Sequence, residues 1–266
     1  MVKKLPKFRL ARTAAVAMGI ALAATSFAEA SESGILAARA QRSFSNGKFA
    51  KGYGQLERAL LASRKESDLF SEGRVLINMA RIRTISLDLN LADSLLTVVR
   101  PEALDASTLV QLVTTKAAIA NARGDYQKAN KNCESIVADS LKNAQETAQA
   151  AYYSECAIAQ AGARQMDAAN ESLKMVGKRT DKKGGFYAFT AARIADISGN
   201  AEADSLYRIA EAKAIQANLP FTTATILYLR SQLKSTPKKE AEDLKLRCKN
   251  AFELIGLPNN AKRCSK

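Results

Sequence analysis

The segment AAIANARGDYQKANKNCESI, residues 117–136, contains the pattern that decides the fold. Apolar residues recur every three or four positions on both sides of Gly124 and Asp125, which is the periodicity of a helix packed on one face. Gly followed by Asp favours a turn, so the segment predicts two helices joined by a short connection. Ala117 and Ala129 stand twelve residues apart, where small side chains let two helix axes approach each other closely.

Pairs of small residues with this spacing recur along the chain. The other four pairs are Ala40 and Gly52, Ala80 and Ala92, Ala157 and Ala169, and Ala191 and Ala203. The units that contain the five pairs begin near Ser33, Gly73, Val110, Ala150 and Gly184, and a degenerate sixth begins near Thr225. Successive units therefore begin 34 to 41 residues apart. Self-similarity at a period of this length indicates helical units that stack on one another.

These units resemble the tetratricopeptide repeat, a helix-turn-helix unit whose two helices meet through small residues. The resemblance extends over residues 33–254 and implies an all-α fold, a right-handed α-solenoid of about five to six helix-turn-helix units. The family's Trp is absent, since the chain contains none, and most units lack the family's closing Pro. A helical bundle without repeats is the alternative.

The N-terminus has the three parts of a secretory signal peptide. Residues 1–12 carry five basic residues and no acidic one, and an uncharged run rich in Ala follows over residues 13–27. Ala28-Glu29-Ala30 then has the small-x-small pattern of a cleavage site. We therefore expect an exported protein, periplasmic or else secreted, with no transmembrane segment after cleavage. An uncleaved membrane anchor is the alternative.

Cleavage after Ala30 predicts three parts: a signal peptide at 1–30, a helical-repeat domain at 31–254 and a basic tail at 255–266. The formal net charge of the whole chain is +14, and removal of residues 1–30 reduces 40 basic and 26 acidic residues to 35 and 25, a net charge of +10. Residues 170–266 account for +8 of it. This basic third is either solvated surface or a contact for an anionic envelope polymer, and we expect no nucleic-acid partner.

The four cysteines bear on the compartment, because disulfides persist in oxidising environments. Cys133 and Cys156 lie on helices that stacked units would place side by side, so we expect a disulfide between them. A second disulfide between Cys248 and Cys264 would pin the basic tail onto the last helix. Buried free thiols are the alternative.

Composition argues against most enzyme chemistries. The chain has no His, so it lacks the usual general base of Ser-His and Cys-His catalysis and a common zinc ligand. The cysteine spacings do not form paired CxxC motifs, and no phosphate-loop or nucleophile-elbow motif occurs. We therefore expect no enzyme activity, no cofactor and no metal site.

In a solenoid of this kind, the first helix of each unit lines a concave groove. The mixture of small, apolar and polar residues expected there suits an extended peptide or a helix. The residues that we expect to face the groove are Gln41, Phe44, Ile77, Arg81, Thr84, Gln111, Thr114, Asn121, Ile158, Ala188 and Asp196. Some of them are core residues if the alignment of the units is shifted.

The leading hypothesis is an exported, non-enzymatic helical-repeat protein that binds proteins or peptides of the cell envelope as a scaffold or assembly factor. One alternative is the superhelical accessory part of a cell-wall (peptidoglycan) enzyme. The other is a basic module that binds anionic envelope polymers.

Overall fold

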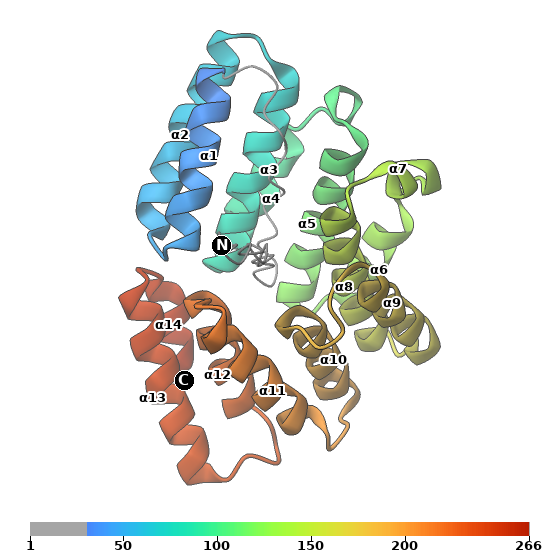
Figure 1. Ribbon diagram of the computed structural model, residues 1–266, viewed down its shortest axis with the longest axis vertical. Coiled ribbons are helices and arrows are strands. Elements are labelled where there is room, and N and C mark those ends of the chain that lie inside the picture. Colours follow the sequence, from blue (N-terminus) through green and yellow to red (C-terminus); the bar gives the residue numbers. More distant parts are fainter. Residues whose placement is uncertain (1–30, 266) are drawn as a thin grey trace, which may run out of the picture.

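Figure 1 shows the computed structural model of the protein, which describes residues 31–265. The predicted signal peptide, 1–30, lies outside the described residues. Within the described range the chain is helical and contains no strand, so the all-α prediction is confirmed. The elements are α1 (Glu32–Ser45), α2 (Phe49–Lys65), α3 (Leu69–Ile85), α4 (Leu89–Thr97), η1 (Pro101–Ala103), α5 (Ala106–Arg123), α6 (Tyr126–Glu134), α7 (Ala138–Asn143), α8 (Glu146–Gly162), α9 (Met166–Arg179), α10 (Gly185–Ser198), α11 (Ala203–Gln216), α12 (Pro220–Ser231), α13 (Lys238–Leu254) and α14 (Pro258–Cys264).

Local signals explain where several helices begin and end. Asp68, Asp105 and Asp125 each accept a hydrogen bond from a backbone N–H in the first turn of the following helix, which satisfies a donor that the helix leaves free. Gly124 ends α5 with a φ of 77°, a left-handed conformation that glycine adopts without steric cost. The Gly-Asp sequence thus ends one helix and starts the next.

Consecutive helices pack in pairs, and the small residues identified from the sequence lie where the members of each pair meet. The pairs are α1 with α2, α3 with α4, α5 with α6, α8 with α9, α10 with α11, and α12 with α13. The small residues of the first four units are all buried: Ala40, Gly52, Ala80, Ala92, Ala117, Ala129, Ala157 and Ala169. A Cβ at Gly52 would lie 2.5 Å from the ring of Phe44, so this position in α2 requires glycine.

The fifth unit departs from the expected register. Ala192 is fully buried there, whereas Ala191, the residue predicted to be at the contact, is half-buried. Ala203 is buried as predicted. The spacing of twelve residues therefore misplaces the first contact of this pair by one residue.

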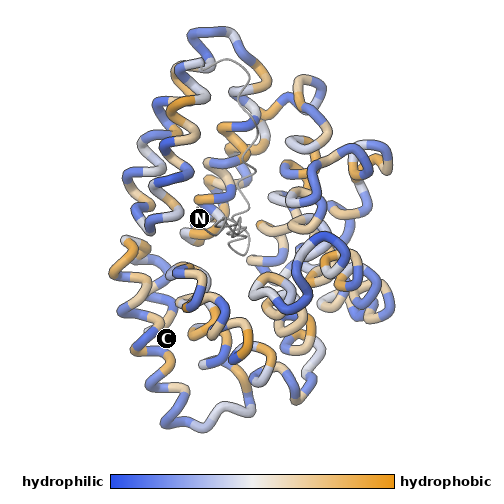
Figure 2. The backbone as a smooth tube through the Cα atoms, in the orientation of Figure 1, coloured by the Kyte–Doolittle hydropathy of each residue, from blue (hydrophilic) through white to orange (hydrophobic). Residues whose placement is uncertain are grey.

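Helices also pack between neighbouring pairs, with α5 against both α3 and α8, and α8 against α10. The tube in Figure 2 alternates between hydrophobic and hydrophilic residues along each helix, as expected for helices that bury one face. The short helix α7 lies between α6 and α8 and packs against α5.

The N-terminal and C-terminal helices share one hydrophobic cluster, so the series of pairs closes on itself (Figure 1). One hydrophobic cluster contains buried residues of α1, α2 and α3 together with residues of α12, α13 and α14. The rings of Phe49 and Phe221 are 6.0 Å apart between centroids, and that of Phe221 is 5.9 Å from that of Phe252. A solenoid alone does not predict this closure.

The expected basic tail, 255–266, contributes to the closure. It forms α14, and Leu257, Ala261 and Cys264 are buried in the shared cluster while Lys262 stays exposed. Its apolar face therefore packs like that of any other helix in the fold.

Two disulfides are present in the described part of the chain. Cys133 of α6 is bonded to Cys156 of α8, with a Cα–Cα distance of 5.8 Å. Cys248 of α13 is bonded to Cys264 of α14, with a Cα–Cα distance of 6.0 Å. The first links neighbouring pairs, and the second fixes α14 to α13.

None of the helices in residues 31–265 combines the length and hydropathy needed to span a membrane. In the same range, no three or more acidic or Cys side chains come together in a way that could hold a metal ion.

Candidate functional site

The first helices of five consecutive pairs converge on one internal cavity, which we call the central cavity. It has a volume of about 230 Å³ and is lined by residues of α3, α5, α8, α10 and α12. Its apolar residues are Ile85, Ala118, Ala122, Ala151, Phe186, Phe189 and Phe221. Its polar residues are Arg81, Thr84, Thr114, Thr115, Ser154, Glu155, Thr222 and Thr225. Helices that are far apart in the sequence thus form a single site.

Charged groups in this wall are poorly solvated. Asn121 donates from Nδ2 to the backbone carbonyl of Glu155 at 3.0 Å and to its Oε2 at 2.9 Å. Desolvation raises the pKa of Glu155, and the hydrogen bond from Asn121 and the charges of Arg193 and Arg81 oppose it only in part. Desolvation also lowers the pKa of Arg81 to about 10, against the influence of Glu155. Arg81 therefore stays charged at neutral pH.

Most threonine hydroxyls of the central cavity are already used within their own helices. Thr84, Thr114, Thr115 and Thr225 each donate to the carbonyl four residues earlier, at distances between 2.7 and 2.9 Å. These four threonines therefore offer a ligand mainly their methyl groups. Thr222 differs, because its Oγ1 is buried and has no hydrogen-bond partner among the described residues.

A second cavity, the lateral cavity, adjoins the first and has a volume of about 570 Å³. It lies between the start of α8, the connection from α9 to α10, and the end of α11. Its wall is more polar and includes Glu146, Thr147, Lys178, Arg179, Thr180, Asp181, Gly184, Gly185 and Lys213. Phe186 and Thr222 belong to the walls of both cavities, so the two are neighbours.

A third cavity, the N-terminal cavity, has a volume of about 190 Å³. Gln41, Phe44 and Phe49 line it from α1 and α2, opposite the start of α12. Phe221 and Thr222 are common to its wall and that of the central cavity. Thr222 therefore contributes to the walls of all three cavities.

The residues expected in the groove fall into three groups. Arg81, Thr84 and Thr114 line the central cavity, whereas Gln41 and Phe44 line the N-terminal cavity.

The second group is buried in helix packing outside the cavity walls: Ile77, Gln111, Ile158 and Ala188. Ile77 is fully buried in a cluster with residues of α4 and α5, because its side of α3 faces those helices. These four positions are therefore corrected from groove to core.

The third group, Asn121 and Asp196, lines none of the three cavities and instead makes hydrogen bonds or ion pairs with neighbouring residues. Asn121 is buried and holds Glu155, while Asp196 accepts a hydrogen bond from the Tyr207 hydroxyl at 2.9 Å and pairs with Arg193 at 3.3 Å.

Sequence reasoning missed Glu155 and the three phenylalanines of the central cavity. Glu155 lies two residues before the small residue Ala157, as Thr115 does before Ala117. Glu155 is an acidic residue on the Ala-rich helix α8, and it aligns with Thr115, a cavity residue of the preceding unit. This alignment could have identified Glu155 as a cavity residue. Phe186, Phe189 and Phe221 gave none, because apolar residues at helical spacing are also typical of a core.

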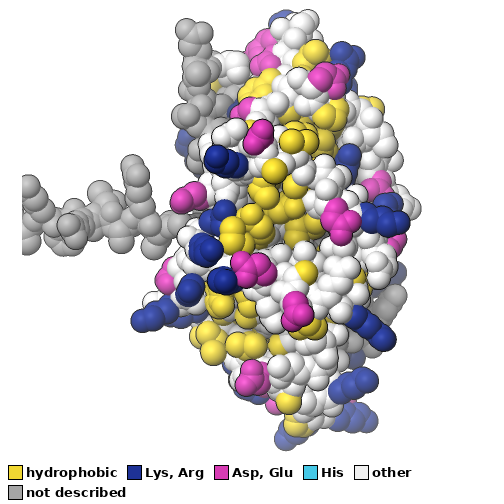
Figure 3. All heavy atoms as spheres, turned by 90° about the vertical axis from the view of Figure 1, so that its right-hand side faces the viewer, with side chains coloured by type: hydrophobic (Ala, Val, Ile, Leu, Met, Phe, Trp, Pro, Cys, Tyr) yellow, Lys and Arg dark blue, Asp and Glu magenta, His cyan; other side chains and the backbone are white. Residues whose placement is uncertain are grey.

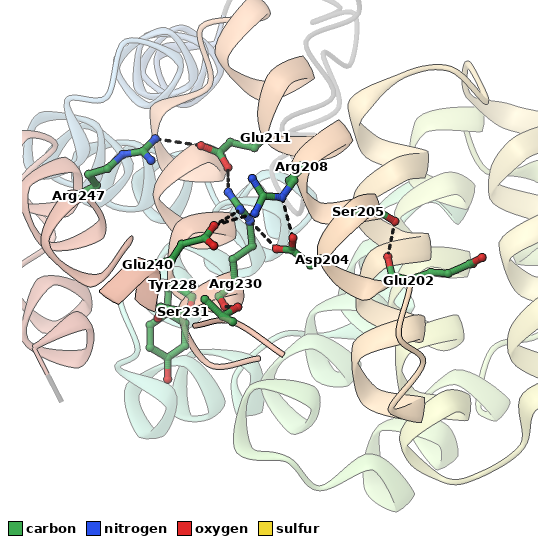
Figure 4. Close-up of polar contacts among 11 residues, drawn as sticks. Glu202, Asp204, Ser205, Arg208, Glu211, Tyr228, Arg230, Ser231, Glu240 and Arg247 are labelled. Atoms are coloured by element: carbon green, nitrogen blue, oxygen red, sulfur yellow. Dashed lines mark hydrogen bonds and ion pairs between the residues drawn. The ribbon is translucent and has the colours of Figure 1, made fainter. Parts of the chain in front are cut away.

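Figure 4 shows an ion-pair cluster that joins α11, α12 and α13. The Arg230 side chain is 4% exposed and lies between three carboxylates. Its Nε is 2.9 Å from Asp204, its Nη1 is 2.5 Å from Glu211 and its Nη2 is 3.0 Å from Glu240. The arrangement neutralises a buried charge and has a structural role.

Basic residues of the C-terminal third are partly used in this cluster. Arg208 pairs with Asp204 at 2.7 Å, and Arg247 pairs with Glu211 at 3.1 Å. On the face drawn in Figure 3, basic and acidic side chains are interspersed around an apolar band.

Comparison with models of known protein families gives no match to this chain. A search of curated proteins likewise finds no match.

Proposed function

We propose that this chain is an exported, non-enzymatic helical-repeat protein whose inner cavities bind an extended segment of another protein of the cell envelope. The observation that carries the proposal is the convergence of five first helices on the central cavity. In a repeat protein, such an inner surface is the usual place for a binding partner.

We further propose that the paired helices form a tetratricopeptide-like, right-handed solenoid whose ends have met. Small residues recur between the members of the first five pairs, and the first helices α3, α5, α8 and α10 pack successively on one another. Closure at the ends turns an open groove into a chain of cavities.

Export is supported by the two disulfides, since such bonds are rare in a reducing cytosol. The basic and apolar segments of residues 1–30 agree with it. The proposed compartment is therefore the periplasm or the exterior of the cell.

An extended peptide fits the cavities better than a globular surface does. Each cavity accepts a side chain or two, and the adjoining walls let neighbouring residues of one segment occupy different cavities. Rings of Phe186, Phe189 and Phe221 offer apolar contact of the kind that anchors peptide side chains. Binding of anionic polymers has less support, because Arg208, Arg230 and Arg247 are paired with carboxylates.

Photo-crosslinking in intact cells tests this function. A benzoylphenylalanine placed at Thr147, which is exposed at the wall of the lateral cavity, should capture one recurrent protein segment that mass spectrometry can map. The matched control carries the same group at the exposed Lys131 of α6. Capture of the same segment from both positions, or none from Thr147, would refute a partner in the cavities.

A further inference from the structure

Glu155 is the one acidic residue in the described wall of the central cavity, and one of its carboxylate oxygens makes no hydrogen bond there. Oε2 accepts the hydrogen bond from Asn121 Nδ2 at 2.9 Å, whereas Oε1 accepts none from residues 31–265. The residue is half-buried, and Oε1 is not one of the polar atoms that are fully enclosed without a partner, so it keeps accessible surface. The central cavity therefore contains an acceptor that the fold leaves available.

Other polar groups of this wall are engaged more fully. The hydroxyls of Ser154 and Thr190 share a hydrogen bond of 2.8 Å behind the wall. Thr114 and Thr115, like Thr84 and Thr225, donate to carbonyls of their own helices. Since hydrogen bonds to a carboxylate are stronger than those to a neutral oxygen, Glu155 is the strongest acceptor that this wall offers to a ligand.

The charges around Glu155 favour a neutral donor. Arg81 of α3 and Arg193 of α10 both attract its carboxylate, and Arg193 also pairs with Asp196 at 3.3 Å. A cationic ligand group would meet repulsion from the two arginines, and an anionic group would meet repulsion from the carboxylate itself. A hydroxyl group avoids both and still donates a hydrogen bond.

The rest of the central cavity suits an aromatic ring. Phe186 and Phe189 of α10 and Phe221 of α12 contribute their rings, and Ala118 and Ala122 of α5 contribute methyl groups. Contact between aromatic rings stabilises a complex beyond the burial of area alone. The volume of about 230 Å³ exceeds the roughly 150 Å³ of a protein cavity that binds benzene, so there is room for a ring with a substituent.

We infer that the central cavity binds a tyrosine side chain of the partner segment, with its ring among the phenylalanines and its hydroxyl donating to Glu155 Oε1. This inference rests on the proposed function and names the side chain that anchors the partner. Asn121 acts as a positioning residue, because its bond to Oε2 holds the carboxylate. A phenylalanine in the same place would cover Oε1 without supplying a donor, so the site selects Tyr over Phe.

Three neutral amides test this selection: N-acetyl-tyrosine amide, N-acetyl-phenylalanine amide and N-acetyl-leucine amide. They carry no terminal charges and differ only in the side chain. Binding to the purified protein with both disulfides formed is followed by NMR of ¹³C-labelled alanine methyl groups, because Ala118, Ala122 and Ala151 lie in the cavity wall. The tyrosine amide should shift these signals and bind about tenfold more tightly than the phenylalanine amide. The leucine amide should bind most weakly, since it offers no ring.

One variant identifies the acceptor. Glu155→Gln keeps the size of the side chain, and its amide oxygen can still accept from Asn121, but the charge is lost. The preference for tyrosine amide over phenylalanine amide should then fall to about threefold or less, because a neutral acceptor forms the weaker bond. Retained binding of the phenylalanine amide shows that the cavity of the variant is intact. Glu57→Gln makes the same change at an exposed site of α2 and should leave the preference unchanged.

The outcomes separate this inference from the proposed function. Equal binding of the tyrosine and phenylalanine amides overturns the selection of a donor, and equal binding of the leucine and tyrosine amides overturns the selection of a ring. A preference for tyrosine amide that persists unchanged in Glu155→Gln overturns the role of Glu155. Failure of all three amides to shift the cavity signals overturns the inference as a whole, whereas crosslinking from Thr147 decides the proposed function separately.

Discussion

Asn260 of α14 donates from Nδ2 to the backbone carbonyl of Ile85, at the end of α3, over a distance of 2.9 Å. This bond joins residues 175 positions apart in the sequence. It lies where the last helix meets the third, beside the hydrophobic cluster shared by both ends of the chain. The disulfide from Cys264 to Cys248 holds α14 in place for this contact.

Replacement of Asn260 by Ala should weaken the closure. Loss of a hydrogen bond to a backbone carbonyl is expected to lower the free energy of unfolding by about 1 kcal/mol, measured by urea denaturation. Asn259→Ala is the control, since its bond to Ser86 O is longer, at 3.4 Å, and exposed. Equal effects of the two changes would indicate that the Asn260 bond adds nothing to the closure.

The contact between α5 and α6 should not tolerate a larger residue at Ala129, which is fully buried. Ala129→Leu should lower the free energy of unfolding by about 1–3 kcal/mol through overpacking. Lys131→Leu on the exposed side of α6 should change it by less than about 0.5 kcal/mol. Similar losses would mean that the small residue is not needed at this contact.

Arg230 should be the most sensitive member of the ion-pair cluster. Arg230→Met leaves the carboxylates of Asp204, Glu211 and Glu240 without their central partner, so we expect a loss of about 3–5 kcal/mol in urea denaturation. Arg208→Met removes a half-exposed partner and should cost less than about 1 kcal/mol. A loss of stability with Arg208→Met as large as that with Arg230→Met would contradict this ranking.

Glu155 should oppose folding at neutral pH. Its folded-state pKa is raised above the ordinary 4.5, mainly by desolvation, so the protonated form is favoured in the folded state. The ionised form therefore lowers stability above the raised pKa, and this cost disappears as the pH falls below 4.5.

Glu155→Gln imitates the protonated form and should be more stable than wild type at pH 8, with the difference vanishing near pH 4. Thermal unfolding across this range measures it. A variant less stable than wild type at pH 8 would show that the attraction between Glu155 and Arg81 outweighs the desolvation of the carboxylate.

The helices and their pairing could be predicted from the sequence, because local contacts such as that of Ala117 with Ala129 recur at a fixed spacing along the chain. The closure contact between Ile85 and Asn260 could not be predicted, since these residues lie on distant helices that share no sequence period. The rotation of α10 about its axis, which buries Ala192 in place of Ala191, depends on packing and cannot be predicted from residue spacing.

The residues that line the cavities could be predicted from the sequence only in part, for the same reason. Arg81, Thr84 and Thr114 follow from the alignment of units. Thr222 and Phe221 reach the cavities from α12, the first helix of the degenerate sixth unit, whose alignment gave no groove positions.

The most direct test of the account is a binding isotherm for the segment captured by crosslinking, prepared as a synthetic peptide. Ala118→Phe places a ring in the central cavity, while Lys116→Phe on the exposed side of the same helix is the matched control. We predict that Ala118→Phe weakens binding at least tenfold without lowering the unfolding temperature, and that Lys116→Phe leaves the affinity unchanged. Equal affinity of Ala118→Phe and wild type for this peptide would contradict binding in the central cavity.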